Sequence, residues 1–267
     1  MASQQAAPEA ADTTSRLPLF YRDPQQLSSE RHGGWRLADG NAAFAAEAPY
    51  VPIVASELAS AARSYPIVFA AGDAQPIAIL GLERQNLFVE DGRWAADHYV
   101  PAYVRRYPFG FIATADPAGF ALAIDAGSDR VLQSGTEGAA LFEDGKPSEL
   151  TRQALDFCAA FGRDAEVTKL LAVALQEKDL LIDRRADATL PDGRSFGLTG
   201  FQIVDREKFA GLDDDTILAW HRSGLLGLIH HHLASLERFP SLLNRQALRV
   251  AAEAAPAAKP KSKKVPS

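Results

Sequence analysis

The chain has 267 residues, of which 47% are hydrophobic, and its 28 Lys and Arg residues face 34 Asp and Glu. This composition is typical of a soluble globular protein, and a single cysteine excludes a disulfide framework, an all-cysteine zinc site and an iron–sulfur cluster. No run approaches 18 apolar residues and no secretory signal opens the chain, so we expect a cytoplasmic protein without a membrane-spanning helix.

The two ends differ from the rest in composition. Residues 1–16 are rich in Ala, Gln and Thr, and residues 250–267 carry four lysines and three prolines. Neither segment has enough apolar side chains to offset the entropy of ordering, so both are predicted to be disordered tails around one domain at 17–249. Without residues 251–267 the chain keeps 24 basic and 33 acidic residues, a net charge of about −9, which argues against a nucleic-acid partner.

The first half of the chain is predicted to form β-structure. Short apolar runs separated by Gly, Asp and Pro predict buried strands at 65–69, 77–80, 86–89, 109–112 and 120–124. Most intervals are too short for crossover helices, which favours antiparallel pairing. Asp91-Gly92 and Asp144-Gly145 are typical of hairpin turns. Two intervals have helical character, 56–64 and 97–106, the second beginning at Asp97 and ending before Pro108.

From Pro147 the apolar period changes to that of helices. The spacing predicts one helix over 150–161, ended by Gly162, and a second over 167–175. A hairpin is expected over 186–204 and a final helical stretch over 213–238 with a break at Gly224. Together these elements predict a single-domain α+β fold, with a mostly antiparallel sheet first and packing helices later. Cys158 lies on an apolar helix face and is expected in the core.

His230, His231 and His232 resemble a metal site, but consecutive helical residues point about 100° apart and cannot converge on one ion. His232 shares a face with leucines and is expected to be a core histidine. Asp213-Asp214-Asp215 is expected to cap the helix that begins at Thr216. No nucleophile elbow, phosphate loop, zinc-protease or dinucleotide motif occurs. We therefore expect no metal and no cofactor, and catalytic residues remain unknown.

Two segments combine aromatic rings with arginines. The first, 19–36, holds Tyr21, Arg22, Glu30, Arg31, His32 and Trp35. That mixture suits recognition of an anionic or peptide-like ligand, and it equally suits a structural arm whose polar groups pair internally, which is the favoured interpretation. The second, 94–109, spaces Tyr99, Tyr103 and Tyr107 four apart beside Arg105 and Arg106. It is either an aromatic–arginine ligand face or a helix packed on the sheet, and packing is favoured.

These stretches resemble the SapC family of bacterial proteins. The resemblance covers roughly 17–243 and rests on LPLFYRDPQQLSSERHGGWRL, VPIVASEL, YPIVFA, NLFVEDGRW, YVPAYVRRYPF, LFEDGKPSELTRQALDFC, LPDGRSFGLTGFQIVD and SGLLGLIHHHLASLERFPSLL. It implies an accessory protein related to surface layers or the envelope, which binds a protein or peptide partner. It carries no established catalytic residues. A peptide-transporter permease, which shares the name, needs several membrane-spanning helices and is excluded.

The resemblance also implies that members of this family are encoded beside genes for cupin-like proteins, flavin-dependent halogenase-like proteins and TonB-dependent receptors. The alternative is therefore an enzyme or ligand-binding module that works beside a flavin- or iron-dependent partner. That alternative requires the polar residues of 30–35 to share one concave site with Arg105 and Arg106.

Overall fold

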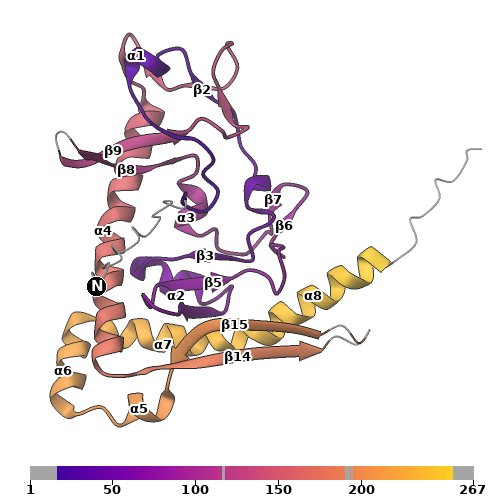
Figure 1. Cartoon of the computed structure of the whole chain (residues 1–267), viewed down its shortest axis with the longest axis vertical. Helices are drawn as coiled ribbons and strands as arrows, with labels where there is room; N and C mark the ends of the chain where they lie inside the picture. Colours follow the sequence, from indigo (N-terminus) through magenta and orange to yellow (C-terminus); the bar gives the residue numbers. More distant parts are fainter. Residues whose placement is uncertain (1–16, 116–117, 190–192, 194, 255–267) are drawn as a thin grey trace, which may run out of the picture.

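The computed structural model describes residues 17–115, 118–189, 193 and 195–254 (Figure 1). Its upper part holds two small sheets and its lower part a larger one. One long helix, α4 (Glu149–Glu177), runs beside both parts (Figure 1). The α+β fold with antiparallel sheets is confirmed. Within the described ranges, no helix combines the length and apolar character needed to cross a bilayer.

The lower sheet has five antiparallel strands in the order β14-β15-β4-β5-β3. The predicted strands at 65–69 and 77–80 correspond to β4 (Ile67–Ala70) and β5 (Pro76–Ile79), and β3 is Tyr50–Pro52. The predicted hairpin is confirmed as β14 (Leu181–Thr189) and β15 (Ser195–Val204), and most of its turn lies outside the described residues.

The upper part contains β1 (Pro24–Gln26), β9 (Ala118–Asp125) and β8 (Phe109–Ala115) as one antiparallel sheet. Beside it, β2 (Arg36–Leu37) pairs with β10 (Val131–Leu132) and β11 (Ala139–Ala140). The strands expected at 109–112 and 120–124 are thus confirmed.

The two Asp-Gly turns are present as predicted. Asp91-Gly92 joins β6 (Val89–Glu90) to β7 (Arg93–Trp94), and Asp144-Gly145 joins β12 (Phe142–Glu143) to β13 (Lys146–Pro147). The Asp and Gly of both turns have positive φ values of 49° and 73°, as this tight hairpin turn requires. The strand expected over 86–89 is wrong apart from Val89, because Leu87 and Phe88 are buried in a turn that precedes the hairpin.

The helices predicted at 150–161 and 167–175 are one helix, α4, so the expected break at Gly162 is wrong. A single glycine weakens a helix by only about 1 kcal/mol relative to alanine. The buried residues of α4 lie along one face that reaches both the upper core, at Cys158, and the lower core, at Leu171 and Leu175. Cys158 is therefore in the core, as expected.

The helix expected over 97–106 is also wrong in extent, since only α3 (Ala102–Arg105) is helical. Asp97 has a positive φ of 63°, and Pro101 restrains the residue before it to extended conformations. Tyr99 lies before this helix and Tyr107 after it, so the three tyrosines do not form one helical face. The region expected to be helical at 56–64 contains a short 3-10 turn, η2 (Ala55–Glu57), and α2 (Leu58–Ala61).

The C-terminal helices follow a short α5 (Arg206–Ala210) and cover the lower sheet (Figure 1). Asp213 caps α6 (Asp214–Ser223) and accepts a hydrogen bond from the Thr216 amide, and Gly224, at φ 81°, separates it from α7 (Leu225–Ser235). The cap is confirmed at Asp213 alone, because the helix begins at Asp214 and not at Thr216, and the break at Gly224 is confirmed.

The last helix, α8 (Phe239–Ala254), was not predicted. Residues 250–254, expected to begin a disordered tail, continue it, because Val250 is buried and the next four residues are alanines and a glutamate, which favour helix. The remaining tail residues, 1–16 and 255–267, lie outside the described residues.

Candidate functional site

The arm, defined here as residues 17–37, is fixed to the upper sheet by buried hydrogen bonds. The Tyr21 hydroxyl donates to the Phe109 carbonyl, and burial raises the pKa of that phenol above its ordinary value. The fully buried carboxylate of Asp125 accepts from the backbone amides of Arg22 at 3.0 Å and Asp23 at 2.6 Å. It also accepts the Tyr107 hydroxyl at 2.7 Å. Tyr21 and Asp125 therefore have structural roles.

The other polar residues of the arm gather around α1 (Ser29–His32), at the top of Figure 1. His32 is fully buried, its Nδ1 lies 3.1 Å from the Ser28 amide, and its ring meets Trp35 edge to face at 4.4 Å. Burial lowers the pKa of His32. Arg31 donates to Gln25 at 3.2 Å, and Glu30 is exposed. These neighbours are internal, which agrees with a structural arm.

Arg106 is stacked between aromatic rings in the interior. Its guanidinium carbon lies 4.1 Å from the ring centre of Tyr103, 4.4 Å from that of Phe161 and 5.8 Å from that of Tyr21. Contacts of this kind hold a desolvated cation without a carboxylate. The Tyr103 hydroxyl donates to the Leu19 carbonyl at 3.2 Å. Arg106 and Tyr103 thus join the arm to α3 and α4.

Arg105, the next residue, is exposed and is held from one side only. Its Nε donates to the Val100 carbonyl at 3.1 Å and a terminal nitrogen donates to the Tyr99 hydroxyl at 2.9 Å. The ring of Phe157 on α4 lies 5.1 Å from its guanidinium carbon. Among the described residues no carboxylate lies within ion-pair distance of Arg105, so its charge is available to a ligand.

A buried carboxylate positions this arginine. Glu57 accepts from the amides of Val54 at 3.0 Å and Ala102 at 2.7 Å and from the Tyr99 hydroxyl at 3.0 Å. Burial raises the pKa of Glu57, and burial together with that carboxylate raises the pKa of Tyr99 to about 12. The Tyr99 phenol therefore keeps its proton at neutral pH, donates to Glu57 and accepts from Arg105.

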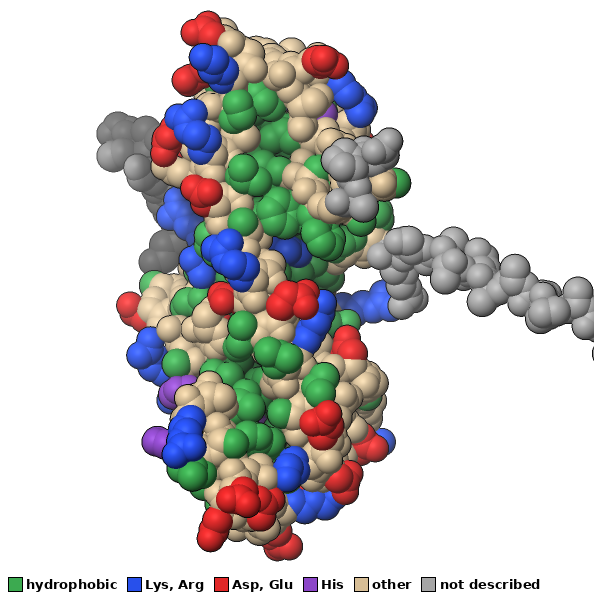
Figure 2. All heavy atoms as spheres, turned by 90° about the vertical axis from the view of Figure 1, so that its left-hand side faces the viewer, with side chains coloured by type: hydrophobic (Ala, Val, Ile, Leu, Met, Phe, Trp, Pro, Cys, Tyr) green, Lys and Arg blue, Asp and Glu red, His purple; other side chains and the backbone are tan. Residues whose placement is uncertain are grey.

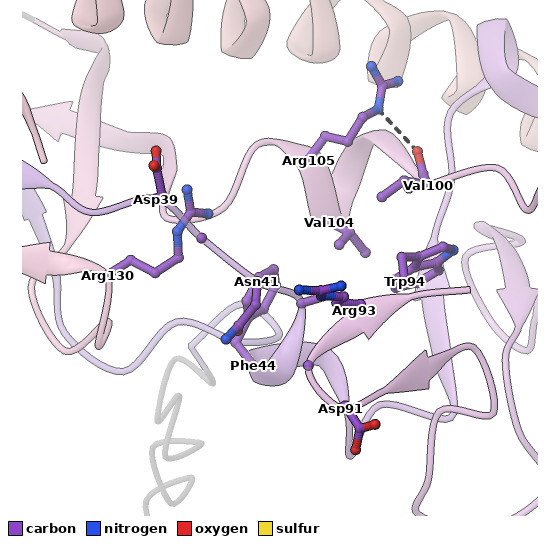
Figure 3. A pocket seen from close by; sticks show the side chains of 13 residues that line it. Asp39, Asn41, Phe44, Asp91, Arg93, Trp94, Val100, Val104, Arg105 and Arg130 are labelled. Carbon is purple, nitrogen blue, oxygen red and sulfur yellow. Dashed lines mark hydrogen bonds between the residues drawn. The ribbon is translucent and has the colours of Figure 1, made fainter. Parts of the chain in front are cut away.

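Arg105 forms one wall of a cleft of about 630 Å³ between the upper and lower parts, named here the arginine cleft (Figure 3). Arg93 on β7 and Arg130 before β10 form two further sides. Trp94, Phe44 and Val104 supply apolar surface, and Asp39, Asn41 and Asp91 complete the polar lining. In Figure 3 the Arg105 guanidinium points toward α4, away from those of Arg93 and Arg130, so a ligand that reaches all three must be extended. Guanidinium groups beside aromatic walls are suited to carboxylates on such a ligand.

Arg130 is held close to the backbone at the cleft wall. It donates to the Tyr107 carbonyl at 3.1 Å, and its half-buried state lowers its pKa, although an arginine remains charged at neutral pH. A Cβ at Gly40 would stand 1.9 Å from the Arg130 Nε, so the position of this side chain requires glycine there. Its Nε has no hydrogen-bond partner within the described residues.

Two smaller hollows adjoin Arg105, of about 240 and 260 Å³. Cys158 lines the first, but burial raises the pKa of its thiol to about 11, so it stays protonated and is a poor nucleophile at neutral pH. Glu57 lines the second and is already hydrogen-bonded three times. No histidine lines the arginine cleft or either hollow.

The histidine cluster does not assemble a ligand set. His232 is fully buried, with Nδ1 3.0 Å from the Ile67 carbonyl and Nε2 3.1 Å from the Val204 amide. Both ring nitrogens are thereby used, and burial lowers its pKa to about 4. Across the described residues no group of three or more His, Cys, Asp or Glu side chains is placed to hold a metal ion.

The predicted site residues therefore divide into separate groups. Tyr21, Tyr103 and Arg106 meet in the interior, Arg22 makes an exposed ion pair with Asp129 at 3.0 Å, and Arg105 alone faces the cleft. The α1 residues line neither the cleft nor its adjoining hollows. Sequence reasoning missed Arg93 and Arg130. Gly40-Asn41, near Arg130, is a common turn sequence and did not indicate a binding site.

Comparison with known families identifies the chain. The SapC family model matches residues 27–242, more than three quarters of its length. The chain belongs to the SapC family. Comparisons with curated proteins and with solved structures gave no significant match. The match gives the family and the residues matched, so the arginine cleft rests on its geometry.

Proposed function

We propose that this SapC-family protein is a non-enzymatic accessory protein that binds an acidic, extended segment of a partner protein in the arginine cleft. The observation that carries the proposal is the set of Arg93, Arg105 and Arg130, which surround one cleft without a carboxylate partner among the described residues. Guanidinium groups bind carboxylates in bidentate geometry, and Trp94 and Phe44 add apolar contact area. From the family name we infer a partner at the surface layer or envelope.

The alternative, an enzyme or cofactor-dependent module, has less support. It requires the α1 residues and the α3 arginines to share one site. The structure separates them, with His32 enclosed by Ser28, Gln25 and Trp35. The carboxylates that line the cleft are Asp39 and Asp91, and both are exposed.

A peptide titration tests the proposal. The probe is the synthetic peptide acetyl-Tyr-Glu-Glu-Tyr-Glu-Glu-amide, followed by isothermal titration calorimetry at low and physiological salt. Binding is expected to weaken with salt, and the triple variant Arg93→Gln, Arg105→Gln, Arg130→Gln should weaken it by about tenfold or more, since charge-assisted contacts are lost. The matched control, Arg31→Gln in the arm, should bind as the wild type does.

The same peptide with Gln in place of Glu separates charge from shape. If the Gln peptide binds equally well, or the Arg31→Gln variant loses affinity as the triple variant does, the acidic-segment proposal is wrong. Cross-linking in native cells followed by membrane fractionation tests the envelope partner separately. A partner found only among cytosolic metabolic enzymes would contradict that part.

A further inference from the structure

A hollow of about 240 Å³, named here the core hollow, lies between the upper core and the N-terminal half of α4. Its apolar walls come from β2, β8 and α4, through Leu37, Phe109, Leu150, Ala154 and Phe157. Leu37 and Phe109 belong to the upper core and are 8% and 5% exposed. Protein interiors are close-packed, and an empty apolar space beside a core lowers stability. The core hollow is therefore a candidate site for a small ligand.

Short side chains on α4 make room for this hollow. Ala154 and Cys158 are four residues apart, so they lie one above the other on the helix face that lines it. Helix α4 lies on the side of the molecule that Figure 2 shows, where hydrophobic side chains are exposed between charged ones. Of its lining residues, Gln153 is exposed and Phe157 half-buried, so the hollow reaches solvent between them. A small molecule can enter there.

Three arginines meet at the core hollow, and its described lining includes no Asp or Glu. They are Arg105, Arg106 and Arg130. Within the described residues three buried side-chain polar atoms have no hydrogen-bond partner, and two of them are the Nε atoms of Arg106 and Arg130. Neither of these arginines makes an ion pair with another described residue. Asp39 lies near Arg130 but lines the arginine cleft and not the hollow (Figure 3).

The aromatic contacts of Arg106 leave its hydrogen-bond donors unused. Its guanidinium carbon lies 4.1 Å from the ring centre of Tyr103 and 4.4 Å from that of Phe161. The N–H groups of a guanidinium lie in its plane, so rings stacked on its faces leave the edge for an acceptor. A buried donor without an acceptor is unfavourable, and a carboxylate oxygen would satisfy it. The arginines therefore favour an anion in the hollow.

We propose that the core hollow binds a small monocarboxylic acid with an apolar body, such as an arylalkanoic acid. Its carboxylate accepts hydrogen bonds from Arg106 and Arg130, and its body packs against Ala154 and Phe157. A volume of about 240 Å³ holds on the order of ten non-hydrogen atoms, fewer than a peptide segment needs. Inorganic phosphate or sulfate would match the arginines and leave the apolar walls uncovered.

This site goes beyond the binding of an acidic segment and does not depend on it. Arg106 and Ala154 line the core hollow and not the arginine cleft, whereas Arg93 lines the cleft and not the hollow. Arg105 and Arg130 line both, so variants at those two positions cannot separate the two sites. Residues that line one site alone make the separation possible.

The probe is 3-phenylpropionate, titrated into the ¹⁵N-labelled full chain at physiological salt and followed by amide chemical shifts. A dissociation constant of about 1 mM or tighter is expected for a ligand of this size. The uncharged isostere 3-phenylpropanamide should bind at least about tenfold more weakly, because it loses the charge-assisted hydrogen bonds. Acetate should also bind at least about tenfold more weakly, because it lacks the apolar body.

Ala154→Phe fills the hollow and should weaken binding of 3-phenylpropionate by about tenfold or more. Ala159→Phe makes the same change on α4 at a residue that does not line the hollow, and it should bind as the wild type does. Arg106→Lys keeps a cation but loses the planar fork, so binding should weaken about three- to tenfold. Circular dichroism and thermal unfolding check that each variant folds.

Two variants distinguish this site from the arginine cleft. Arg93→Gln should weaken the acidic peptide about threefold and leave 3-phenylpropionate unaffected, and Ala154→Phe should do the reverse. No binding of 3-phenylpropionate at about 10 mM, equal binding of the amide, or full affinity in Ala154→Phe would overturn the proposal. Failure of the acidic peptide to bind, with 3-phenylpropionate bound as expected, would overturn the acidic-segment proposal alone.

Discussion

The arm and the arginine cleft have similar compositions and different roles. Both combine arginines, acids and aromatic rings within short spans. In the arm these groups are used internally, by the Asp125 carboxylate, by Gln25 and by ring contacts at His32. In the cleft, Arg105 and Arg130 are held by backbone carbonyls, which fix their position, and neither makes an ion pair with another described residue. The neighbours of a charged group, more than its presence, separate a structural segment from a binding site.

The largest effect is expected where the arm is anchored. Asp125→Ala removes one buried carboxylate and leaves the amides of Arg22 and Asp23 and the Tyr107 hydroxyl without their acceptor. Each unsatisfied buried donor costs about 1–3 kcal/mol, so the free energy of unfolding should fall by about 3 kcal/mol or more. Urea denaturation measures it.

The matched control for that variant is Asp129→Ala. Asp129 pairs with Arg22 at the surface, where its side chain is 95% exposed, and its loss should change stability by less than about 0.5 kcal/mol. Equal losses in the two variants would contradict the anchoring role of Asp125.

A smaller and different effect is expected at the cleft wall. Gly40→Ala places a methyl group where the Arg130 guanidinium now lies and should displace that side chain. Because an arginine can rotate away, stability should change by less than about 1 kcal/mol, while affinity for the acidic peptide falls about three- to tenfold. Calorimetry and urea denaturation together measure both.

Gly34→Ala in the arm is the control, since a Cβ there meets no atom within 4 Å. It should change neither the stability nor the affinity for the acidic peptide. Wild-type affinity in Gly40→Ala would show that Arg130 does not contribute to binding.

The smallest expected effect is a pH dependence that differs between the arm and the arginine cleft. Burial lowers the pKa of His32, so its neutral form stabilises the arm fully above pH 6.5, and that stability is lost as pH falls toward the lowered pKa. Hydrogen exchange, corrected for intrinsic rates, should show arm amides losing protection over this range. A guanidinium group, unlike an imidazole, stays charged throughout this range.

The contribution of His232 to the stability of the fold is lost over the same range, between pH 6.5 and about 4, and this weakens the fold as a whole. Comparison with His32→Asn separates the local effect from the global one. Arm protection with the same pH dependence in that variant would contradict the role of His32.

Local chemistry was predictable from sequence where it acts over a few residues. The Asp-Gly turns, the cap at Asp213 and the break at Gly224 follow from backbone preferences, and they are where the sequence placed them. The length of α4 was not predictable, because packing against both cores outweighs the small cost of Gly162. The shortness of α3 was signalled by Pro101.

The arginine cleft was not predictable from the sequence, for a different reason. Arg93, Arg105 and Arg130 come from a hairpin, a short helix and a loop, and only tertiary structure brings them to one hollow. Arg105 was noticed because it adjoins Arg106 and three tyrosines. Arg105 faces solvent, whereas Arg106 is stacked between rings. Their positions depend on Phe157 and Phe161 of α4, some 50 residues later in the chain.

Chemical-shift mapping tests the central claim most directly. Amide resonances of the ¹⁵N-labelled full chain are followed while the acidic peptide acetyl-Tyr-Glu-Glu-Tyr-Glu-Glu-amide is added. We expect the shifted amides to cluster at the walls of the arginine cleft, at 39–44, 91–94 and 99–105, with the amide resonances of α1 unchanged. Shifts centred on 28–36, or none at millimolar peptide, would contradict it.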